Sequence, residues 1–138
     1  MNEAMKIGNI RKYFESIEKI VDKNIVYGYV GPRKRDYFFW GALSSFKQKS
    51  YIVAFYPDEI ILAQLTSMGK FSEERIILSK EDIESMTVKK GMMQYKIRIQ
   101  TDEKKIKLKC NKFILNVPWQ KENITYLEEV DWYNDETF

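Results

Sequence analysis

The feature that most constrains the fold is a regular alternation of apolar and polar residues between Met93 and Cys110. Successive side chains of a β-strand point to opposite faces, so a period of two predicts strands with one buried and one solvated face. The alternation stops at Thr101-Asp102-Glu103, a turn sequence, and then resumes. The two halves should form an antiparallel hairpin with a wet, basic outer face. Its inward side chains are Met93, Tyr95, Ile97, Ile99, Ile106, Leu108 and Cys110.

A second hairpin is predicted between Tyr51 and Leu65, where two apolar runs flank Pro57-Asp58. Proline followed by aspartate favours the dihedral angles of a tight turn. Both runs are apolar almost throughout, so we expect both faces of these strands to be covered, one of them by a helix. Shorter strands are expected at Ile25–Val30, Arg75–Leu78 and Ile83–Val88, and Tyr37–Trp40 reads as a strand or a buried loop.

Helical patterns occur at both ends of the chain. Residues 3–22 carry apolar side chains at spacings of three and four, and this stripe should pack on the sheet; the alternative is that it docks a partner or a second copy. A final helix is expected to begin at Asn116-Val117-Pro118, because proline suits the first helical position, and to run to Val130. The tail Asp131–Phe138 is expected to fray. The chain is therefore divided into residues 1–23 (helix), 24–131 (barrel with its capping helix) and 132–138 (tail).

The order of helix, about seven antiparallel strands and closing helix resembles bacterial PH-like (pleckstrin-homology or GRAM-like) domains. The resemblance rests on Tyr51–Leu62, on Ile77-Leu-Ser-Lys-Glu-Asp-Ile83 and on the late hairpin Met92–Leu108, within about residues 24–130. It implies a mainly β (α+β) fold, a PH-like antiparallel barrel capped by a C-terminal helix, with an extra N-terminal helix. The resemblance also implies a scaffold for recognition and no particular activity.

One departure from that pattern concerns phosphoinositides. PH domains that bind them are similar to one another in a basic pattern over the first two strands and their loop. The strand Tyr51–Tyr56 has no Arg or Lys, which argues against specific recognition of inositol phosphates.

Residues suited to catalysis are few. Histidine is absent, which removes imidazole acid–base chemistry, and a zinc site needs several Cys or His ligands where this chain has only Cys110. Cys110 falls on an inward strand position, where free cysteine behaves as a small buried hydrophobe. Neither G-x-x-x-x-G-K-[ST] nor G-x-G-x-x-G occurs. The sequence predicts a protein that is not an enzyme, with no catalytic residue, metal site or cofactor.

Two groups of cations are candidate binding residues. Those on the outer face of the late hairpin either attract phosphate or keep an exposed strand from aggregating, and the second reading is preferred. Nucleic acid is not expected, because only Gln94 and Gln100 interleave the charges, where aromatic residues would stack on bases. The second group lies beside aromatic residues, which suits an anionic membrane or a protein hot spot; the preferred alternative is a solvated turn beside core aromatics. The candidates are Lys96, Arg98, Lys105, Lys107 and Lys109, and Arg33, Lys34, Arg35 and Trp40.

Length, charge and composition indicate the size class of the protein and the compartment in which it works. The 138 residues fit one globular domain, and a net charge of +3 is modest. No apolar stretch is long enough for a signal peptide or a membrane span, and a single cysteine fits a reducing compartment. Frequent Lys, Ile and Asn is typical of an AT-rich bacterial coding sequence. We therefore expect a cytoplasmic bacterial protein that can lie at the membrane periphery.

Three functions are open. The first is a module for protein–protein or self-association, with contacts from the first helix or from Arg33–Trp40, and with no small-molecule substrate. The second is peripheral binding to an anionic phospholipid membrane through the basic groups. The third is a lipocalin-like barrel that holds an apolar ligand inside.

Overall fold

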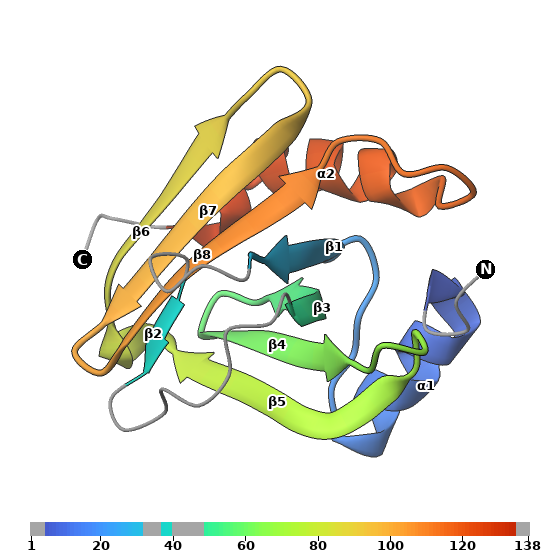
Figure 1. The fold of residues 1–138 in the computed structure, drawn as a ribbon, viewed down its shortest axis with the longest axis horizontal. Coiled ribbons are helices and arrows are strands. Elements are labelled where there is room, and N and C mark those ends of the chain that lie inside the picture. Colours follow the sequence, from blue (N-terminus) through green and yellow to red (C-terminus); the bar gives the residue numbers. More distant parts are fainter. Residues whose placement is uncertain (1–4, 32–36, 40–48, 135–138) are drawn as a thin grey trace.

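The computed structural model of the protein describes residues 5–31, 37–39 and 49–134. Within them the chain is mainly β, with one helix before the strands and one after, as predicted (Figure 1). The elements are α1 (Ile7–Ser16), β1 (Ile25–Val30), β2 (Tyr37–Phe39), β3 (Lys49–Phe55), β4 (Glu59–Leu65), β5 (Phe71–Ser79), a short turn (Lys80–Asp82), β6 (Ile83–Lys90), β7 (Gln94–Thr101), β8 (Lys104–Asn111), α2 (Trp119–Glu129) and a final turn (Asp131–Tyr133).

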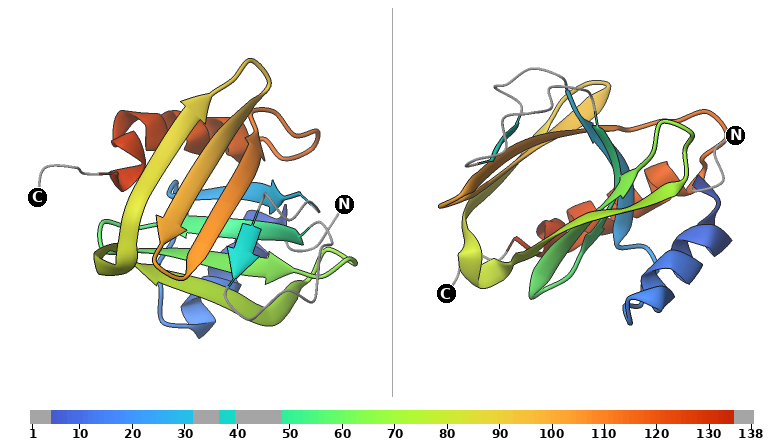
Figure 2. Two further views of the ribbon diagram at one scale, coloured as in Figure 1. Left: turned by 60° about the vertical axis from the view of Figure 1, so that its left-hand side comes forward. Right: turned by 60° about the horizontal axis from the view of Figure 1, so that its bottom comes forward.

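All strand pairs are antiparallel, and the sheet follows the order β5-β4-β3-β1-β8-β7-β6, with β2 paired to β8. β1 joins the two halves. It pairs with β3 over its whole length, but with β8 only at Tyr29 and Val30. The halves therefore splay apart beyond this corner, and Figure 2 shows β6, β7 and β8 crossing the direction of β3, β4 and β5. The sheet curls without closing, because β5 and β6 stand at the two ends of the order.

The concave side of the sheet holds the larger core. Side chains that alternate along β7 and β8 are buried there, as the period of two predicts, and α2 adds Ile124 and Leu127. α2 packs on β1 at this side of the sheet. Burial of this many aliphatic and aromatic side chains supplies most of the stabilisation of a small domain. The predicted arrangement of a curled antiparallel sheet with a packed C-terminal helix is confirmed.

α1 covers the outer face of the other half of the sheet. Ile10 and Phe14 are fully buried and share a core cluster with residues of β1, β3 and β4. This explains why those central strands are apolar on both faces, and it confirms that a helix covers one of them. The apolar stripe of α1 is thus used in packing within the chain.

The predicted helix over residues 3–22 is too long. α1 ends at Ser16, because Glu18 adopts a left-handed conformation (φ 62°) that turns the chain back. The N–H groups of Glu18 and Lys19 donate to the carbonyls of Glu15 and Phe14, at 3.0 Å and 2.8 Å. These two bonds form a Schellman motif, which usually has glycine at the position of Glu18. Ile20, which falls on the apolar stripe predicted for residues 3–22, is 85% exposed.

The segment after α2 does not fray as predicted. Trp132 is only 2% exposed, and its ring lies 5.3 Å from that of Phe55 and 5.6 Å from that of Tyr95, centre to centre. The side-chain amide of Asn134 donates a hydrogen bond of 2.9 Å to the carbonyl of Met86 on β6. Trp132 therefore belongs to the core and Asn134 is held against β6; residues 135–138 lie outside the described part.

Candidate functional site: a cationic sheet face and an adjoining groove

The predicted cations of the late hairpin lie together on the outer face of the half-sheet β6-β7-β8. Lys96 and Arg98 are exposed on β7, and Lys105, Lys107 and Lys109 are exposed or half-buried on β8. Lys89 of β6 joins them, because it pairs with Lys96. The other predicted binding residues, Arg33, Lys34, Arg35 and Trp40, lie outside the described residues.

The strand register arranges these cations in rows across the sheet. One row consists of Lys89, Lys96 and Lys109, directly opposite one another on β6, β7 and β8. The next row places Arg98 beside Lys107, with Thr87 on β6, and the third places Lys105 beside Gln100. Ser85 on β6 completes the third row, and none of the nine residues in these rows is acidic.

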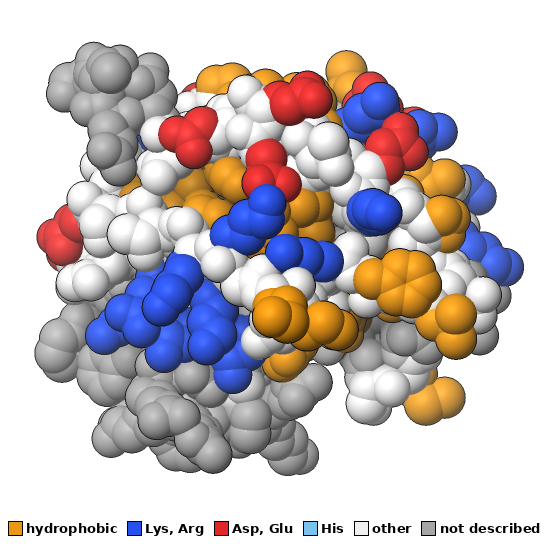
Figure 3. Space-filling view, turned by 90° about the horizontal axis from the view of Figure 1, so that it is seen from above, with side chains coloured by type: hydrophobic (Ala, Val, Ile, Leu, Met, Phe, Trp, Pro, Cys, Tyr) orange, Lys and Arg blue, Asp and Glu red, His pale blue; other side chains and the backbone are white. Residues whose placement is uncertain are grey.

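The rows form a compact lattice of positive charge. Neighbouring strands are about 4.8 Å apart and residues on one face repeat every ~6.8 Å, so three strands and three rows span about 10 Å by about 14 Å. Like charges directly opposite each other destabilise a sheet. In Figure 3, Lys and Arg side chains form one group on the side of β6, β7 and β8, and no acidic side chain interrupts it.

The described residues on either side of positions 32–36 lie beside this half-sheet. Val30, the last residue of β1, pairs with Leu108, and Tyr37, the first residue of β2, pairs with Ile106. β1 and β2 thus run along the same edge of β8, one after the other. The described residues that flank the second predicted cationic group therefore lie next to the strand that carries much of the first.

A groove that the sequence did not predict lies between the β6–β7 turn and α2. It encloses about 560 Å³. Met92, Met93 and Phe113 lie on its rim and are 89%, 75% and 70% exposed. Met93 was expected to face inward, but it belongs to the turn that the N–H of Gly91 closes by donating to the carbonyl of Gln94 at 2.9 Å. The lining residues are Lys90, Met92, Met93, Tyr95, Asn111, Lys112, Phe113, Lys121, Ile124, Thr125 and Glu128.

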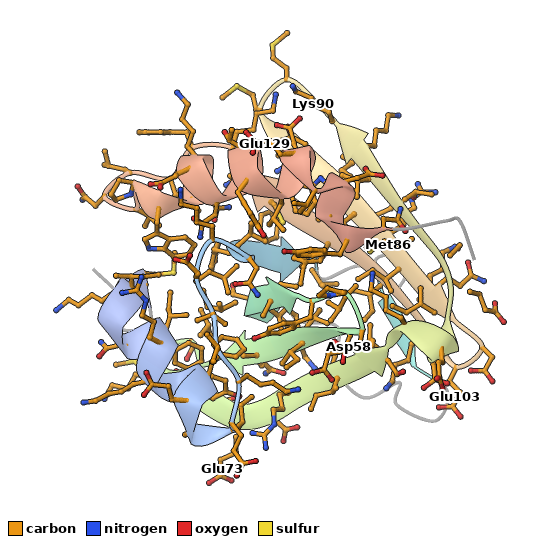
Figure 4. All side chains as sticks on the ribbon, turned by 180° about the vertical axis from the view of Figure 1, so that it is seen from behind. Asp58, Glu73, Met86, Lys90, Glu103 and Glu129 are labelled. Carbon is orange, nitrogen blue, oxygen red and sulfur yellow. The ribbon has the colours of Figure 1, made fainter. Side chains whose placement is uncertain are left out.

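Charged groups of the groove are partly paired. Lys90 Nζ lies 3.5 Å from a carboxylate oxygen of Glu128 on α2. Figure 4 labels Lys90 at the end of β6, on the side of α2. Burial, and then a hydrogen bond and the negative charge of Glu128, raise the pKa of the Tyr95 hydroxyl far above its ordinary value. The ammonium of Lys112 lies 5.4 Å from the centre of the Tyr95 ring, a cation–π distance. Lys121 adds a third cation from α2.

The burial of Cys110 and the grouping of possible metal ligands bear on nucleophilic and metal chemistry. Cys110 is fully buried, and burial raises the pKa of its thiol to about 12, so the thiolate that would act as a nucleophile or ligand is disfavoured. Among the described residues, His, Cys, Asp and Glu form no group of three or more that could hold a metal ion. In the same part of the chain, no helix has the length and apolar character needed to cross a membrane.

Comparison with known proteins adds no relative. The chain matches no protein-family model, no curated protein and no solved structure.

Proposed function

We propose that this protein is a non-enzymatic, PH-like binding module that docks on anionic phospholipid surfaces through the outer face of β6, β7 and β8. The observation that carries the proposal is the row Lys89–Lys96–Lys109 with Arg98 and Lys107 beside it. Repulsion between directly opposed cations lowers the stability of the folded protein. A polyanion placed against the face would relieve that repulsion.

The strength of the attraction is suited to reversible docking. Each Lys or Arg near an anionic membrane surface contributes about 1 kcal/mol, so half a dozen give several kcal/mol without a specific pocket. The β6–β7 turn contains two exposed methionines, Met92 and Met93. They lie at the end of the hairpin that carries Lys89 and Lys96. Apolar side chains beside cations are typical of surfaces that rest at a lipid interface.

The PH-like part of the proposal rests on the arrangement of the elements. The described strands form a curled antiparallel sheet whose halves meet at β1, and a C-terminal helix packs on its concave side. The absence of an enzyme site remains a proposal that follows from the lack of histidine and from the buried thiol.

Association with a protein or a second copy is the rival function. The sequence assigned it to the first helix or to Arg33–Trp40. The apolar stripe of α1 is buried on the sheet, and Arg33–Trp40 lies almost wholly outside the described residues, so the cationic face has the better support. Size-exclusion chromatography with light scattering tests the rival, which predicts a dimer or larger assembly at high protein concentration.

Vesicle flotation tests the membrane proposal. Vesicles of phosphatidylcholine should not retain the protein, whereas vesicles that also contain phosphatidylglycerol should. Binding should fall steeply between about 0.1 M and about 0.5 M NaCl, because exposed charges attract each other over only ~10 Å at 0.1 M and over shorter distances as salt is added. Binding that is equal on both vesicles, or absent from both, would contradict the proposal.

A further inference from the structure

We infer that the groove between the β6–β7 turn and α2 binds one single-chain amphiphile with an anionic head group, a fatty acid being the simplest case. This site lies beside the cationic sheet face but is distinct from it, and the inference does not depend on membrane docking. It also differs from the lipocalin-like alternative that the sequence left open, which places an apolar ligand inside the barrel, because this groove lies between the β6–β7 turn and α2.

The apolar lining of the groove is unusually exposed. Met92, Met93 and Phe113 are each at least 70% accessible, and Ile124 of α2 lies below them. Contact with an alkyl chain would remove this apolar area from water, which favours binding. Methionine and aromatic side chains adapt to flexible apolar ligands, as methionine-rich binding surfaces do. The occupant should therefore have a substantial hydrocarbon part.

The charges specify the other end of the ligand. Lys90, Lys112 and Lys121 line the groove against a single carboxylate, Glu128, which Lys90 and the Tyr95 hydroxyl already engage. Two of the three cations, Lys112 and Lys121, come from different segments of the lining, the loop after β8 and α2. A carboxylate or phosphate head group would complement both, whereas a cationic head group would be repelled.

The groove is preformed and of suitable size. The N–H of Lys112 donates a hydrogen bond of 3.0 Å to the carbonyl of Met93, which ties the turn to the segment that carries Phe113. The enclosed volume of about 560 Å³ falls within the range of about 300–1,000 Å³ typical of small-ligand sites. A compact site of this kind favours a small amphiphile over a long acidic peptide.

Isothermal titration calorimetry with dodecanoate tests the inference, with dodecyltrimethylammonium and dodecanol as comparators of equal chain length. Dodecanoate should bind with one-to-one stoichiometry. The cationic comparator should bind at least about tenfold more weakly, a difference of about 1.4 kcal/mol. No binding of dodecanoate, or equal binding of dodecanoate and the cation, would overturn the inference; in the first case an acidic peptide becomes the leading occupant.

Variants localise the site. Thr125→Trp places a bulky ring on the exposed α2 wall, and Phe113→Ser removes apolar lining; each should weaken dodecanoate binding by about tenfold or more. Leu115→Ser is the matched control, because Leu115 lies in the same loop and is 75% exposed but does not line the groove. Equal loss in Leu115→Ser and Phe113→Ser would also overturn the inference.

The two proposals fail separately. Lys89→Gln, Lys96→Gln and Lys109→Gln together should weaken vesicle binding and leave dodecanoate binding unchanged, since none of the three lines the groove. Loss of dodecanoate binding in this triple variant would contradict the assignment of the amphiphile to the groove. If the triple variant loses vesicle binding but retains dodecanoate binding, the result supports both the assignment of vesicles to the cationic face and that of dodecanoate to the groove.

Discussion

Gln120 of α2 takes the place of a strand partner for Tyr27 of β1. The N–H of Tyr27 donates to Gln120 Oε1, and Gln120 Nε2 donates back to the Tyr27 carbonyl, both at 2.9 Å. Nε2 also donates to the carbonyl of Asn111 at 3.0 Å. Before Tyr29, β1 does not pair with β8, so these part-buried backbone groups would otherwise lack a partner in the sheet. Asn123 acts similarly, donating to the carbonyl of Ile25 at 2.9 Å.

Replacing Gln120 should therefore be costly. Gln120→Leu keeps the side-chain size but leaves three part-buried backbone groups without their hydrogen bonds, and we expect a loss of about 3 kcal/mol in the free energy of unfolding. Urea denaturation measures this. Glu122→Gln, at an exposed position on the same helix, is the control and should change stability by less than about 0.5 kcal/mol. A loss below about 1 kcal/mol in Gln120→Leu would show that water satisfies these groups.

Glu18→Gly should stabilise the protein. Glu18 is exposed and holds φ at 62° in the Schellman motif that ends α1, a conformation that glycine adopts without strain. We expect a gain of about 0.5–1 kcal/mol in thermal or urea unfolding. The same exchange at Glu15, inside α1 and exposed, should lower stability by about 1 kcal/mol. Losses at both positions would contradict the role given to the left-handed residue.

Neutralising the centre of the cationic row should also stabilise the fold. Lys96 lies opposite Lys89 and Lys109, so Lys96→Gln removes two repulsive cross-strand pairs and should add about 0.5 kcal/mol at low salt. The gain should shrink at ~1 M salt, where charges more than about 3 Å apart are screened. A loss of stability at low salt would mean that the row is not repulsive in the folded protein.

The thiol of Cys110 should be inert until the protein unfolds. Burial raises its pKa from 9.0 to about 12, so the folded state holds the proton more tightly than the unfolded state. The resulting stability is complete below pH 9 and is lost as the pH rises from there toward 12. A disulfide reagent should label the thiol only in denaturant, and the alkaline loss of stability should be smaller in Cys110→Ala. Rapid labelling of the native protein would contradict the burial.

The sequence predicted the parts of the fold that depend on local periodicity. The alternation from Tyr95 to Cys110 matches the alternating burial of β7 and β8, and the two-sided apolarity of β3 and β4 matches their covering by α1 and α2. The cationic face followed from the same alternation. The rows of cations on this face could not be predicted from the alternation, because they depend on the register between three strands.

What the sequence missed depends on backbone conformations that its residue types do not signal. Glutamate at position 18 gives no glycine-like stop for α1. Trp132 reaches the core through three successive left-handed residues, Asp131–Tyr133, with φ of 52°, 56° and 53°. None is glycine, so nothing in the pattern marked this turn. The groove combines Met92 and Phe113 with α2, and no local pattern links segments that distant.

The cationic face is the centre of the proposed function, and a comparison at equal net charge tests it most directly. One variant carries Lys89→Gln, Lys96→Gln and Lys109→Gln, and the other carries Lys12→Gln, Lys23→Gln and Lys70→Gln on α1 and the loops. Each triple variant has a net charge of zero in place of +3, since three lysines are replaced by neutral glutamines. Flotation with vesicles containing phosphatidylglycerol should show binding weakened about 100-fold in the first variant, at about 1 kcal/mol per lysine, and nearly unchanged in the second. Equal weakening in both variants would contradict a defined binding face.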